Sequence, residues 1–525
     1  MTSKAILHVF EEYQVARTKF VQSVAELASR PQNAEALQNV GALALLRPLL
    51  LDNVPSIQQS AALAIGRLAS HSEATAESVI SNDVLPQLVY SLAEQNRYFK
   101  KSAAFVLRNV AKHSPALAQA VADSGALEAL VDCLGDFEPA VKEHAALALA
   151  AVARHGPELA QAALDAGAVS QLVLCVQEPE LSLKRVAAHS IGELAKHLPD
   201  HAQAIVDVGA VSYLAPLLQH NDSRLKRHTC TALAHIAKHS VDMAEAVVEA
   251  DVYPKLLFLL KDSDLVVRRC AATLVRETVK HTPELARLVV NCGGHGALVD
   301  FVAEEIVDEG EREVSADDKL PAIMALGYIS AFSDTLASAV IQAHGVLALK
   351  SALSHGNADY VRAAAAWSLG QIGRHTPDHA KALAQADVLR KLVELIAETS
   401  VEGETKGETS MRGDLHDKAL MALRTALNKC TMCSALEALM FNAPHEVLKL
   451  VLEQFVKILP NDKASRKSFV TSGCLEKAQQ LKTENAPVFE DVVAVLNNLF
   501  PAEVVAYYQP DFHEKLIEKI DEIEP

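Results

Sequence analysis

The chain has few aromatic residues, and it has fewer basic than acidic residues. Aromatics make up 5% of the 525 residues, and Trp367 is the single tryptophan. This disfavours propellers and sandwiches, whose cores use large rings, and favours packed Ala, Leu and Val helices. The formal charge of −17 comes from 66 acids against 49 bases, which disfavours general binding to nucleic acids or anionic membranes. We therefore expect protein partners, with no nucleic acid and no membrane among them.

Cysteines and long apolar runs are also few. The eight cysteines are irregularly spaced, which does not suit a disulfide framework and fits a reducing, intracellular compartment. The opening segment MTSKAILHVFEEYQ has glutamates where a signal peptide needs its apolar core. No stretch approaches the ~18 uninterrupted apolar residues of a membrane span. We expect a soluble protein of the cytoplasm.

What the chain does contain is an internal repeat. Two kinds of marker recur every 42 residues in one phase, which indicates repeated structural units. The first marker consists of His71, His113, His155, His197, His239 and His281, followed by His375 after two periods plus ten residues. The second consists of Gly41, Asp83, Gly125, Gly167, Gly209, Asp251 and Gly293, followed after the same slip by Gly345 and Asp387.

Residues 113–154 illustrate how one repeat is built. Ser114 is expected to cap a helix that has Pro115 in its first turn, and Gly125 is expected to end it. A short helix over 126–134 and a longer amphipathic helix over 140–154 follow, with Leu147 expected in the core. Three helices in this arrangement are typical of an armadillo repeat. The sequence thus predicts an all-α, right-handed superhelical solenoid of roughly ten three-helix units, whose third helices line the concave face.

The periodicity also suggests how the chain is organised along its length. We expect an N-terminal helical cap over residues 1–40, with its helix at 5–29, and armadillo repeats over 41–397 that carry an acidic insertion at 304–318. An acidic loop is expected at 398–417, degenerate repeats at 418–500 and a tail at 501–525. Both acidic segments are too polar to bury, so they are interpreted as solvated loops, with a regulatory or partner-binding role as the alternative.

Nothing in the sequence predicts catalysis, a metal or a cofactor. Packed helices lie about 8–10 Å apart, so the recurring histidines cannot share a metal whose ligands lie near 2 Å. They are interpreted as partners for free carbonyls at helix ends. Cys430 and Cys433 form a lone CxxC, and no phosphate-binding or nucleophile motif is present. We expect a protein that is not an enzyme.

A row of bases is the candidate binding site. A base stands thirteen residues before each histidine and is often followed by another, at the start of successive third helices beside the concave groove. Two interpretations stay open: a surface for an acidic partner, or a structural ladder in which each base pairs with an acid of the preceding loop, such as Asp222, Asp262 or Asp264. The concave basic row consists of Lys100, Lys101, Lys142, Lys184, Arg185, Lys226, Arg227, Arg268, Arg269 and Arg362.

The third helices lack the Trp/Asn array by which armadillo nuclear-import adaptors grip basic peptides. The tryptophan positions are occupied by Phe105, Leu147, His189, Thr231, Thr273 and Trp367, and the asparagine positions by Asn109, Ala151, Glu193, His235, Glu277 and Gln371. Binding of nuclear-localisation signals is therefore disfavoured.

Several segments resemble the axonemal armadillo proteins of the sperm-associated antigen six family. They are ILHVFEEYQVARTKFVQSVAELASRPQN, LPQLVYSLAEQNRYFKKSAAFVLRNVAKHSP, AAAAWSLGQIGRHTP and FVKILPNDKASRKSFVTSGCL, and the likeness extends to the YYQP tail. The resemblance implies a non-catalytic scaffold of the central apparatus in cilia and flagella. Such a scaffold would be associated with the C1 microtubule of the central pair and needed for central-pair stability and motility.

The resemblance also implies partners and a location. Central-apparatus proteins, tubulin or both are the expected partners, self-association stays open, and the axonemal cytoskeleton is the expected location. Composition and spacing by themselves support only a non-catalytic armadillo scaffold. The alternative is a cytoplasmic armadillo adaptor for transport or adhesion complexes.

Overall fold

The computed structural model describes residues 3–93, 96–304, 316–399, 409–484, 486–509, 511, 512, 514 and 517. These residues form helices joined by turns, and no strand occurs among them. They divide into two compact units, one ending at Leu259 and the other beginning at Leu260. Each unit is a stack of helices, which confirms the prediction of an all-α repeat solenoid.

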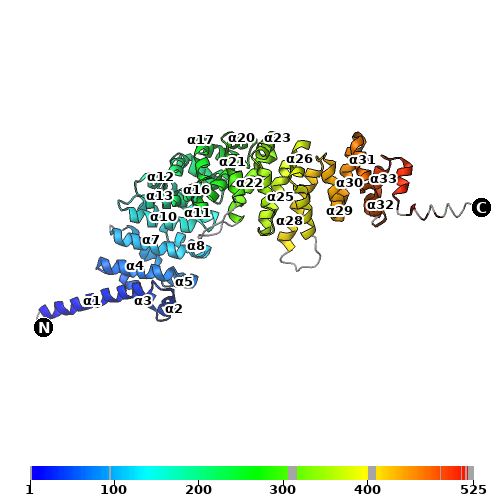
Figure 1. Cartoon of the computed structure of the whole chain (residues 1–525). Coiled ribbons are helices and arrows are strands. Elements are labelled where there is room, and N and C mark those ends of the chain that lie inside the picture. Colours follow the sequence, from blue (N-terminus) through cyan, green and yellow to red (C-terminus); the bar gives the residue numbers. More distant parts are fainter. Residues whose placement is uncertain are drawn as a thin grey trace, which may run out of the picture. The chain divides into compact units, whose positions relative to one another are not determined.

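In the first unit, long helices pack against one another in chain order, α1 on α4, then α7, α10, α13 and α16 (Figure 1). Their bounds are α1 Ser3–Leu27, α4 Pro55–Ala69, α7 Arg97–Ala111, α10 Pro139–Ala153, α13 Leu181–Ala195 and α16 Ser223–Ala237. Shorter helices that open each repeat are α2 Pro31–Asn39, α5 Glu73–Ser81, α8 Pro115–Asp123, α11 Pro157–Asp165, α14 Pro199–Asp207 and α17 Val241–Glu249. The second helices are α3 Ala42–Leu46 with η1 Arg47–Leu51, α6 Leu85–Ala93, α9 Ala126–Leu134, α12 Ala168–Gln177, α15 Ala210–Leu214 with η2 Ala215–Gln219, and α18 Tyr253–Leu259.

The second unit repeats the scheme, with α19, α22, α25 and α28 packed in chain order. Its long helices are α19 Leu265–Val279, α22 Ala316–Phe332, α25 Asp359–Gly373, α28 Thr409–Leu427, α30 His445–Ile458 and α33 Ala486–Asn497. The shorter ones are α20 Pro283–Asn291, α21 Gly294–Ala303, α23 Asp334–Gln342, α24 Gly345–Ser351, α26 Pro377–Gln385, α27 Val388–Thr399, α29 Cys433–Asn442, η3 Leu459–Asn461, α31 Lys463–Thr471, α32 Cys474–Glu484 and α34 Ala502–Tyr507.

The recurring Gly or Asp marks the turn between the first and second helix of a repeat. Gly125 adopts a φ of 76° and Asp83 a φ of 55°, a left-handed conformation that glycine and aspartate tolerate best. One marker was expected a residue too late, because His344 holds the positive φ of 63° and Gly345 begins α24. Gly345 is instead required by packing, since a Cβ there would lie 2.5 Å from the Val340 side chain.

The expected helix starts are mostly present. Pro115 opens α8, but the Ser114 side chain makes no capping hydrogen bond, contrary to expectation. Thr282 and Thr376, which also precede a proline, do cap their helices by accepting a backbone N–H three residues later. Proline alone therefore starts α8.

Alanine and branched aliphatic side chains fill the core between successive long helices. Leu149 is 0% exposed, whereas Leu147, which was expected in the core, is only half-buried. Phe105 and His189, at the equivalent positions of their helices, are half-buried as well, whereas Ala146 and Ala148 beside Leu147 are buried. The expectation for Leu147 was wrong, and Leu149 is the core residue.

The recurring histidines join neighbouring repeats, as their interpretation requires. His113 Nε2 lies 2.7 Å from the carbonyl oxygen of Ala69, and His155 Nε2 lies 2.7 Å from that of Ala111. The accepting carbonyl belongs to the end of the preceding repeat's long helix, where backbone oxygens lack intrahelical partners. The histidines are thus structural links between repeats.

The predicted segment boundaries differ from the structure at several places. Gly41 lies between α2 and α3, so α2 opens a repeat although it was assigned to the 1–40 cap. α28 begins at Thr409, so residues 409–417 are helical rather than part of a loop. The tail expected at 501–525 contains α34. Residues 305–315 and 400–408, the middles of the two acidic segments, lie outside the described residues.

Candidate partner-binding surface

The ten bases of the concave basic row occupy the fourth or fifth position of their helices. They lie on α7, α10, α13 and α16 in the first unit and on α19 and α25 in the second. At these positions most of the side chains point toward the following repeat and meet an acid there. The sequence interpretation that placed the acids in the preceding loop is therefore wrong about the partner.

Six members of the row each form an ion pair with an acid of the following repeat, usually one that lies 36 residues further along the chain. Asp222, proposed as a partner for its own repeat, instead accepts two hydrogen bonds from Arg185 of the repeat before. It also caps α16 by accepting the N–H of Leu225. The pairs are Lys100 Nζ with Asp136 Oδ2 at 3.1 Å, Lys142 Nζ with Glu178 Oε1 at 2.8 Å, Arg185 with Asp222, Arg268 with Glu304, Arg269 Nη1 with Asp318 Oδ1 at 2.9 Å, and Arg362 Nη2 with Glu398 Oε2 at 2.7 Å.

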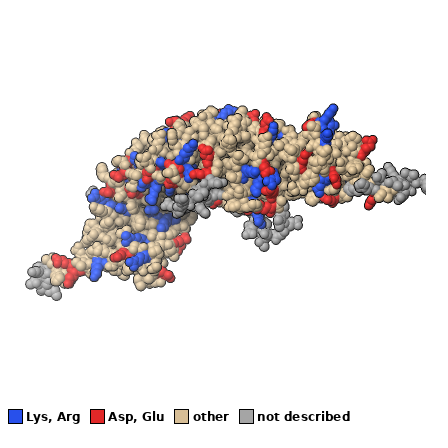
Figure 2. All heavy atoms as spheres, in the orientation of Figure 1, with Lys and Arg blue, Asp and Glu red and all other residues tan. Residues whose placement is uncertain are grey.

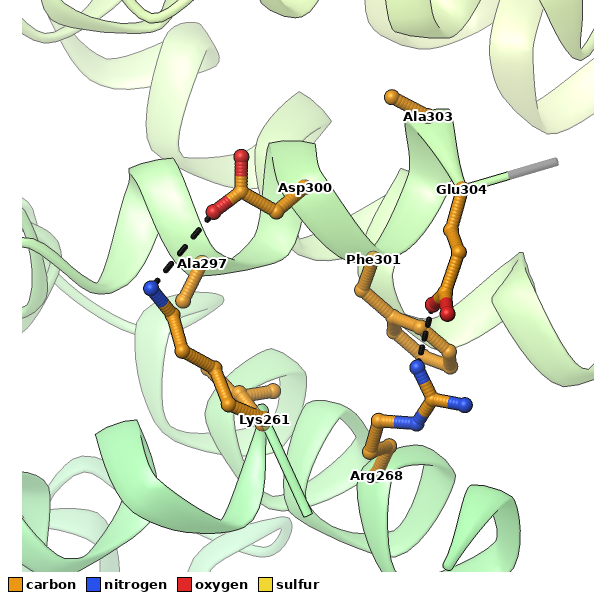
Figure 3. A pocket seen from close by; sticks show the side chains of 8 residues that line it. Lys261, Arg268, Ala297, Asp300, Phe301, Ala303 and Glu304 are labelled. Carbon is orange, nitrogen blue, oxygen red and sulfur yellow. Dashed lines mark hydrogen bonds and ion pairs between the residues drawn. The ribbon is translucent and has the colours of Figure 1, made fainter. Parts of the chain in front are cut away.

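Arg268 shows how such a pair bridges two helices. Its guanidinium lies 5.2 Å from the centre of the Phe301 ring and pairs with Glu304 at the end of α21 (Figure 3). Lys261 pairs with Asp300 on the other side of the same pocket, which encloses about 490 Å³. Both cations of this pocket are ion-paired within the chain.

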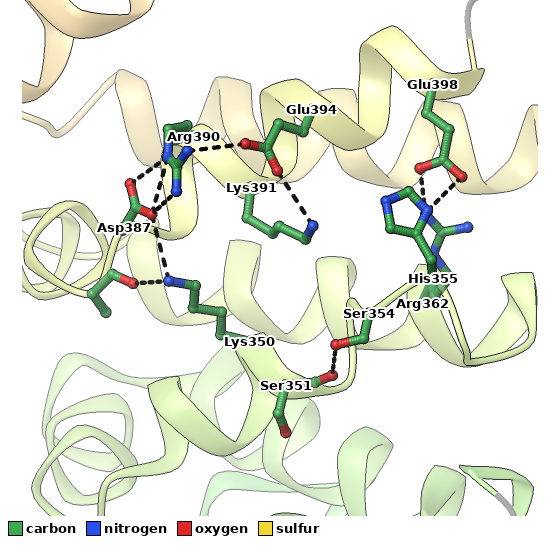
Figure 4. Close-up of polar contacts among 11 residues, drawn as sticks. Lys350, Ser351, Ser354, His355, Arg362, Asp387, Arg390, Lys391, Glu394 and Glu398 are labelled. Atoms are coloured by element: carbon green, nitrogen blue, oxygen red, sulfur yellow. Dashed lines mark hydrogen bonds and ion pairs between the residues drawn. The ribbon is translucent and has the colours of Figure 1, made fainter.

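Arg362 is the most buried member of the row. Its side chain is 5% exposed and forms ion pairs with Asp359 of its own helix and with Glu398 of α27. Figure 4 shows the pair with Glu398. Burial would raise the pKa of Glu398, but the hydrogen bond and charge of Arg362, together with His355, hold it below its ordinary value. The hydrogen bond from Arg185 lowers the pKa of Asp222 in the same way. These acids are ionised partners at neutral pH.

The row is not uniform in its pairing. Lys101 is exposed and Lys184 half-buried, and neither has an acidic partner in the part of the chain that the structure describes. The acid expected 36 residues after Lys184 is replaced by His220. Lys226 and Arg227 are half-buried on α16. Over the surface seen in Figure 2, bases alternate with acids rather than forming one uniform patch.

The positions that carry asparagine in peptide-binding adaptors are used internally here. Asn109 is 5% exposed and donates to the Phe105 carbonyl at 2.9 Å. The His235 ring lies 2.8 Å from the Gly192 carbonyl oxygen, and Glu277 pairs with Lys280. The Asn109 amide is bonded to the backbone, and His235 and Glu277 carry no amide. None of the three therefore offers a peptide the free amide that the adaptors use.

An aromatic pocket on the concave side of the second unit was missed by the sequence analysis. The rings of Tyr328 on α22 and Trp367 on α25 meet edge to face with centres 5.1 Å apart. Met324 and Tyr360 also line this pocket, which encloses about 460 Å³. The sequence analysis assigned no groove positions to Met324 and Tyr328, because the repeat phase shifts before α22. Trp367 was assigned to a groove position.

The described residues contain neither a cluster of metal-ligating side chains nor a single membrane-spanning helix. Among these residues there is no group of three or more metal-ligating side chains. Burial raises the pKa of Cys133 and Cys175 to about 11, so both thiols are protonated. No single described helix is long and apolar enough to cross a membrane, and the pair α11 and α12 that would suffice together is bent by 76°.

Comparison with known structures agrees with the fold. An engineered protein matches 78% of this chain and 94% of its own, with a TM-score of 0.68 at 26% identity. A designed armadillo repeat protein in complex with the peptide (KR)4 matches 45% of this chain and 99% of its own, with a TM-score of 0.43 at 25% identity.

Comparison with known sequences is more specific. The family profile of the SIL1/FES1/HPBP1 C-terminal domain matches residues 117–235, which is less than half of the chain. Two relatives named Sperm-associated antigen 6, from Mus musculus and Homo sapiens, are each 62% identical over 525 residues. The match covers 100% of this chain and 100% and 99% of the two relatives. At this identity and coverage, the chain belongs to the sperm-associated antigen 6 family.

Proposed function

We propose that the protein is a non-catalytic scaffold of the central apparatus in cilia and flagella, where it binds and stabilises the C1 microtubule of the central pair and supports motility. The observation that carries the proposal is 62% identity to sperm-associated antigen 6 over the whole chain. The stacked repeats add physical support, because a solenoid offers a long surface on which several partners can assemble.

We further propose that the concave basic row has two roles. Its ion-paired members, such as Lys142 and Arg362, join neighbouring repeats. Lys101 and Lys184, which have no acidic partner among the described residues, contribute positive charge to partner binding. Central-apparatus proteins, tubulin or both are the proposed partners, and self-association is a further possibility.

The main alternative is a cytoplasmic armadillo adaptor for transport or adhesion complexes. It shares the fold and the non-catalytic character, and it differs in where the protein resides. The absence of a Trp/Asn array on the third helices weighs against a nuclear-import adaptor.

The test is to express a fluorescently tagged chain in ciliated cells from which the cell's own family member has been removed. We expect the signal to stay in the axoneme after detergent extraction and beating to be restored. Averaged density maps of the central apparatus, with and without the protein, are expected to differ at the C1 microtubule. A chain carrying Leu149→Asp, which is expected not to fold, serves as the control.

Two outcomes would overturn the proposal. Signal at the nuclear rim or at cell junctions, with none retained in extracted axonemes, would favour the adaptor. Retention in the axoneme away from the central pair would reject the C1 assignment while leaving the ciliary scaffold intact.

A further inference from the structure

The concave side of the first unit carries a cation that the chain does not neutralise. Arg108 lies on α7, one turn after Phe105, and is half-buried. In the described part of the chain, its guanidinium has neither a hydrogen bond nor an ion pair. Burial is accordingly the one cause that lowers the pKa of Arg108, with no acid to oppose it. The half-buried Arg108 side chain therefore carries a positive charge that no described acid compensates.

The groups around Arg108 are bases as well. Its charge is close enough to lower the pKa of His144 on α10 and of His189 on α13. Arg154 and Lys196, at the ends of these two helices, act on His189 in the same way. Arg154 is exposed and has no acidic partner among the described residues. Three cations on α7, α10 and α13, Arg108, Arg154 and Lys196, therefore act on the half-buried His189, and Glu193 opposes them.

Acids are few on these helices. α7 together with its C-cap residue contains five bases and no acid, although the whole chain has a charge of −17. The two carboxylates on α10 and α13 are already engaged: Glu143 accepts a hydrogen bond from Ser182, and Glu193 pairs with Lys196 at 3.6 Å. Helix-dipole complementarity accounts for Lys112, which donates to the Ser70 carbonyl at 2.8 Å. The dipole also favours Arg108, in the last turn of α7, and Arg154, the C-cap residue of α10, but neither donates to a carbonyl among the described residues.

We propose that the concave face of α7, α10 and α13, centred on Arg108 and Arg154, binds an extended acidic segment of a partner protein. Guanidinium groups favour carboxylates, which they can meet with two parallel hydrogen bonds. Neighbouring helices lie about 8–10 Å apart and an extended chain advances about 3.3 Å per residue, so one carboxylate in every three residues matches the spacing of the helices. Between the charges, the Phe105 and His144 rings lie 6.1 Å apart and supply a less polar floor.

A peptide fits this site better than a nucleic acid does. The whole chain is strongly acidic and repels a long polyanion. This proposal rests on the proposed scaffold function, because it states which kind of partner segment the scaffold binds. The experiment needs only purified protein, so its failure would leave the ciliary assignment untouched.

The experiment measures binding of a fluorescent fifteen-residue peptide, (Glu-Gly-Ser)5, to the full chain by anisotropy at two salt concentrations. The counterparts (Gln-Gly-Ser)5 and (Lys-Gly-Ser)5 report whether the charge and its sign matter. The test variant combines Arg108→Gln with Arg154→Gln. The matched control combines Arg30→Gln with Lys381→Gln, because both bases are exposed, neither belongs to α7, α10 or α13, and the two changes remove the same total charge.

We expect the acidic peptide alone to bind, with an affinity that falls as salt rises. The test variant should bind about tenfold more weakly, and the control should stay within about twofold of the wild type. The melting temperature of Arg108→Gln should hold, because the Arg108 guanidinium makes no hydrogen bond or ion pair among the described residues. A purely structural role for Arg108 would lower it.

Four results would overturn the proposal. They are no binding of the acidic peptide even at low salt, equal binding of the basic peptide, equal weakening by the control variant, and tighter binding of single-stranded nucleic acid than of the peptide. A fall in melting temperature that accompanies the loss of binding would likewise assign Arg108 a structural role.

Discussion

Arg362 offers the sharpest test of the ion pairs that join the repeats. The change Arg362→Gln removes the partner of Glu398 and of Asp359 while keeping a polar side chain of similar length. Breaking a buried pair costs about 3–5 kcal/mol. Because the Glu398 side chain stays 32% exposed and also contacts His355, we expect a loss of about 2–3 kcal/mol in the local stability of α25 and α27.

The matched control is Arg390→Gln. Arg390 also meets two acids, Asp387 at 2.8 Å and Glu394 at 3.2 Å, but its side chain is 62% exposed (Figure 4). Exposed ion pairs contribute about 0.2–1 kcal/mol. The two variants therefore differ in burial and share their chemistry.

The assay is native-state hydrogen exchange, because a repeat protein opens locally and a single unfolding midpoint does not describe it. We expect the slow amides of α25 and α27 to exchange about 30–150-fold faster in Arg362→Gln, and less than about fivefold faster in Arg390→Gln. Equal acceleration by the two variants would refute the argument that burial makes the pair at Arg362 strong. Unchanged exchange in Arg362→Gln would refute the ladder itself.

Three further predictions concern packing and acid stability. Leu149→Asp should unfold much of the first unit and lower its melting temperature by many degrees, because it buries an unpaired charge, whereas Leu147→Asp on the concave face should cost far less. Gly370→Ala should destabilise the contact between α25 and α28, since the new Cβ would lie 2.8 Å from the Ala422 Cα; Gly413→Ala, where nothing lies within 4 Å, should be neutral or stabilising by up to about 1 kcal/mol. Asp222→Asn should reduce the loss of stability as the pH falls below about 4, because the lowered pKa of Asp222 means that the native chain binds fewer protons than the unfolded one there. Equal melting temperatures within each pair of variants, or an unchanged acid limb for Asp222→Asn, would contradict these expectations.

The repeat architecture was predictable because its determinants are local. A left-handed turn needs Gly125 or an equivalent aspartate, a helix starts readily at Pro115, and a 42-residue phase repeats both. Where the phase slips, the prediction failed by one residue, at His344. The fold class follows from such short-range rules even though no single repeat is stable by itself.

The candidate site was less predictable, because its contacts join different repeats. The base row was visible in the sequence, but its acids were sought in the wrong loop, since nothing local reveals that Arg185 points forward to Asp222. Arg108 was overlooked because its position rarely carries a base: the equivalent positions of the next two repeats carry Ala150 and Gly192, and a base returns only at Arg276. Only the three-dimensional structure distinguishes a cation that has a partner from one that lacks it.

The histidines of the concave face lead to a final prediction about acid sensitivity above pH 4. His228 on α16 lies with its ring centre 5.1 Å from that of His189. Burial lowers the pKa of His228 to about 4, helped by the charges of His189, Arg227 and Arg185 and opposed by Asp222. At neutral pH the ring is therefore uncharged in the folded protein.

The direction of the pH effect follows from this lowered pKa. An unfolded histidine titrates near pH 6.5, so between pH 6.5 and 4 the unfolded chain binds the proton and the folded chain does not, and stability falls as the pH falls. The loss from His228 alone should reach on the order of 2–3 kcal/mol near pH 4.

His228→Gln should remove this loss, so that the melting temperature of the variant exceeds that of the wild type by a margin that grows from pH 7 to pH 4.5. His8→Gln is the control, because its ring is 70% exposed and the same margin should not appear. NMR titration of the His228 ring supplies the direct measurement. A ring that protonates above pH 6, or a variant whose advantage does not depend on pH, would show that His228 is not held neutral by its burial between α13 and α16.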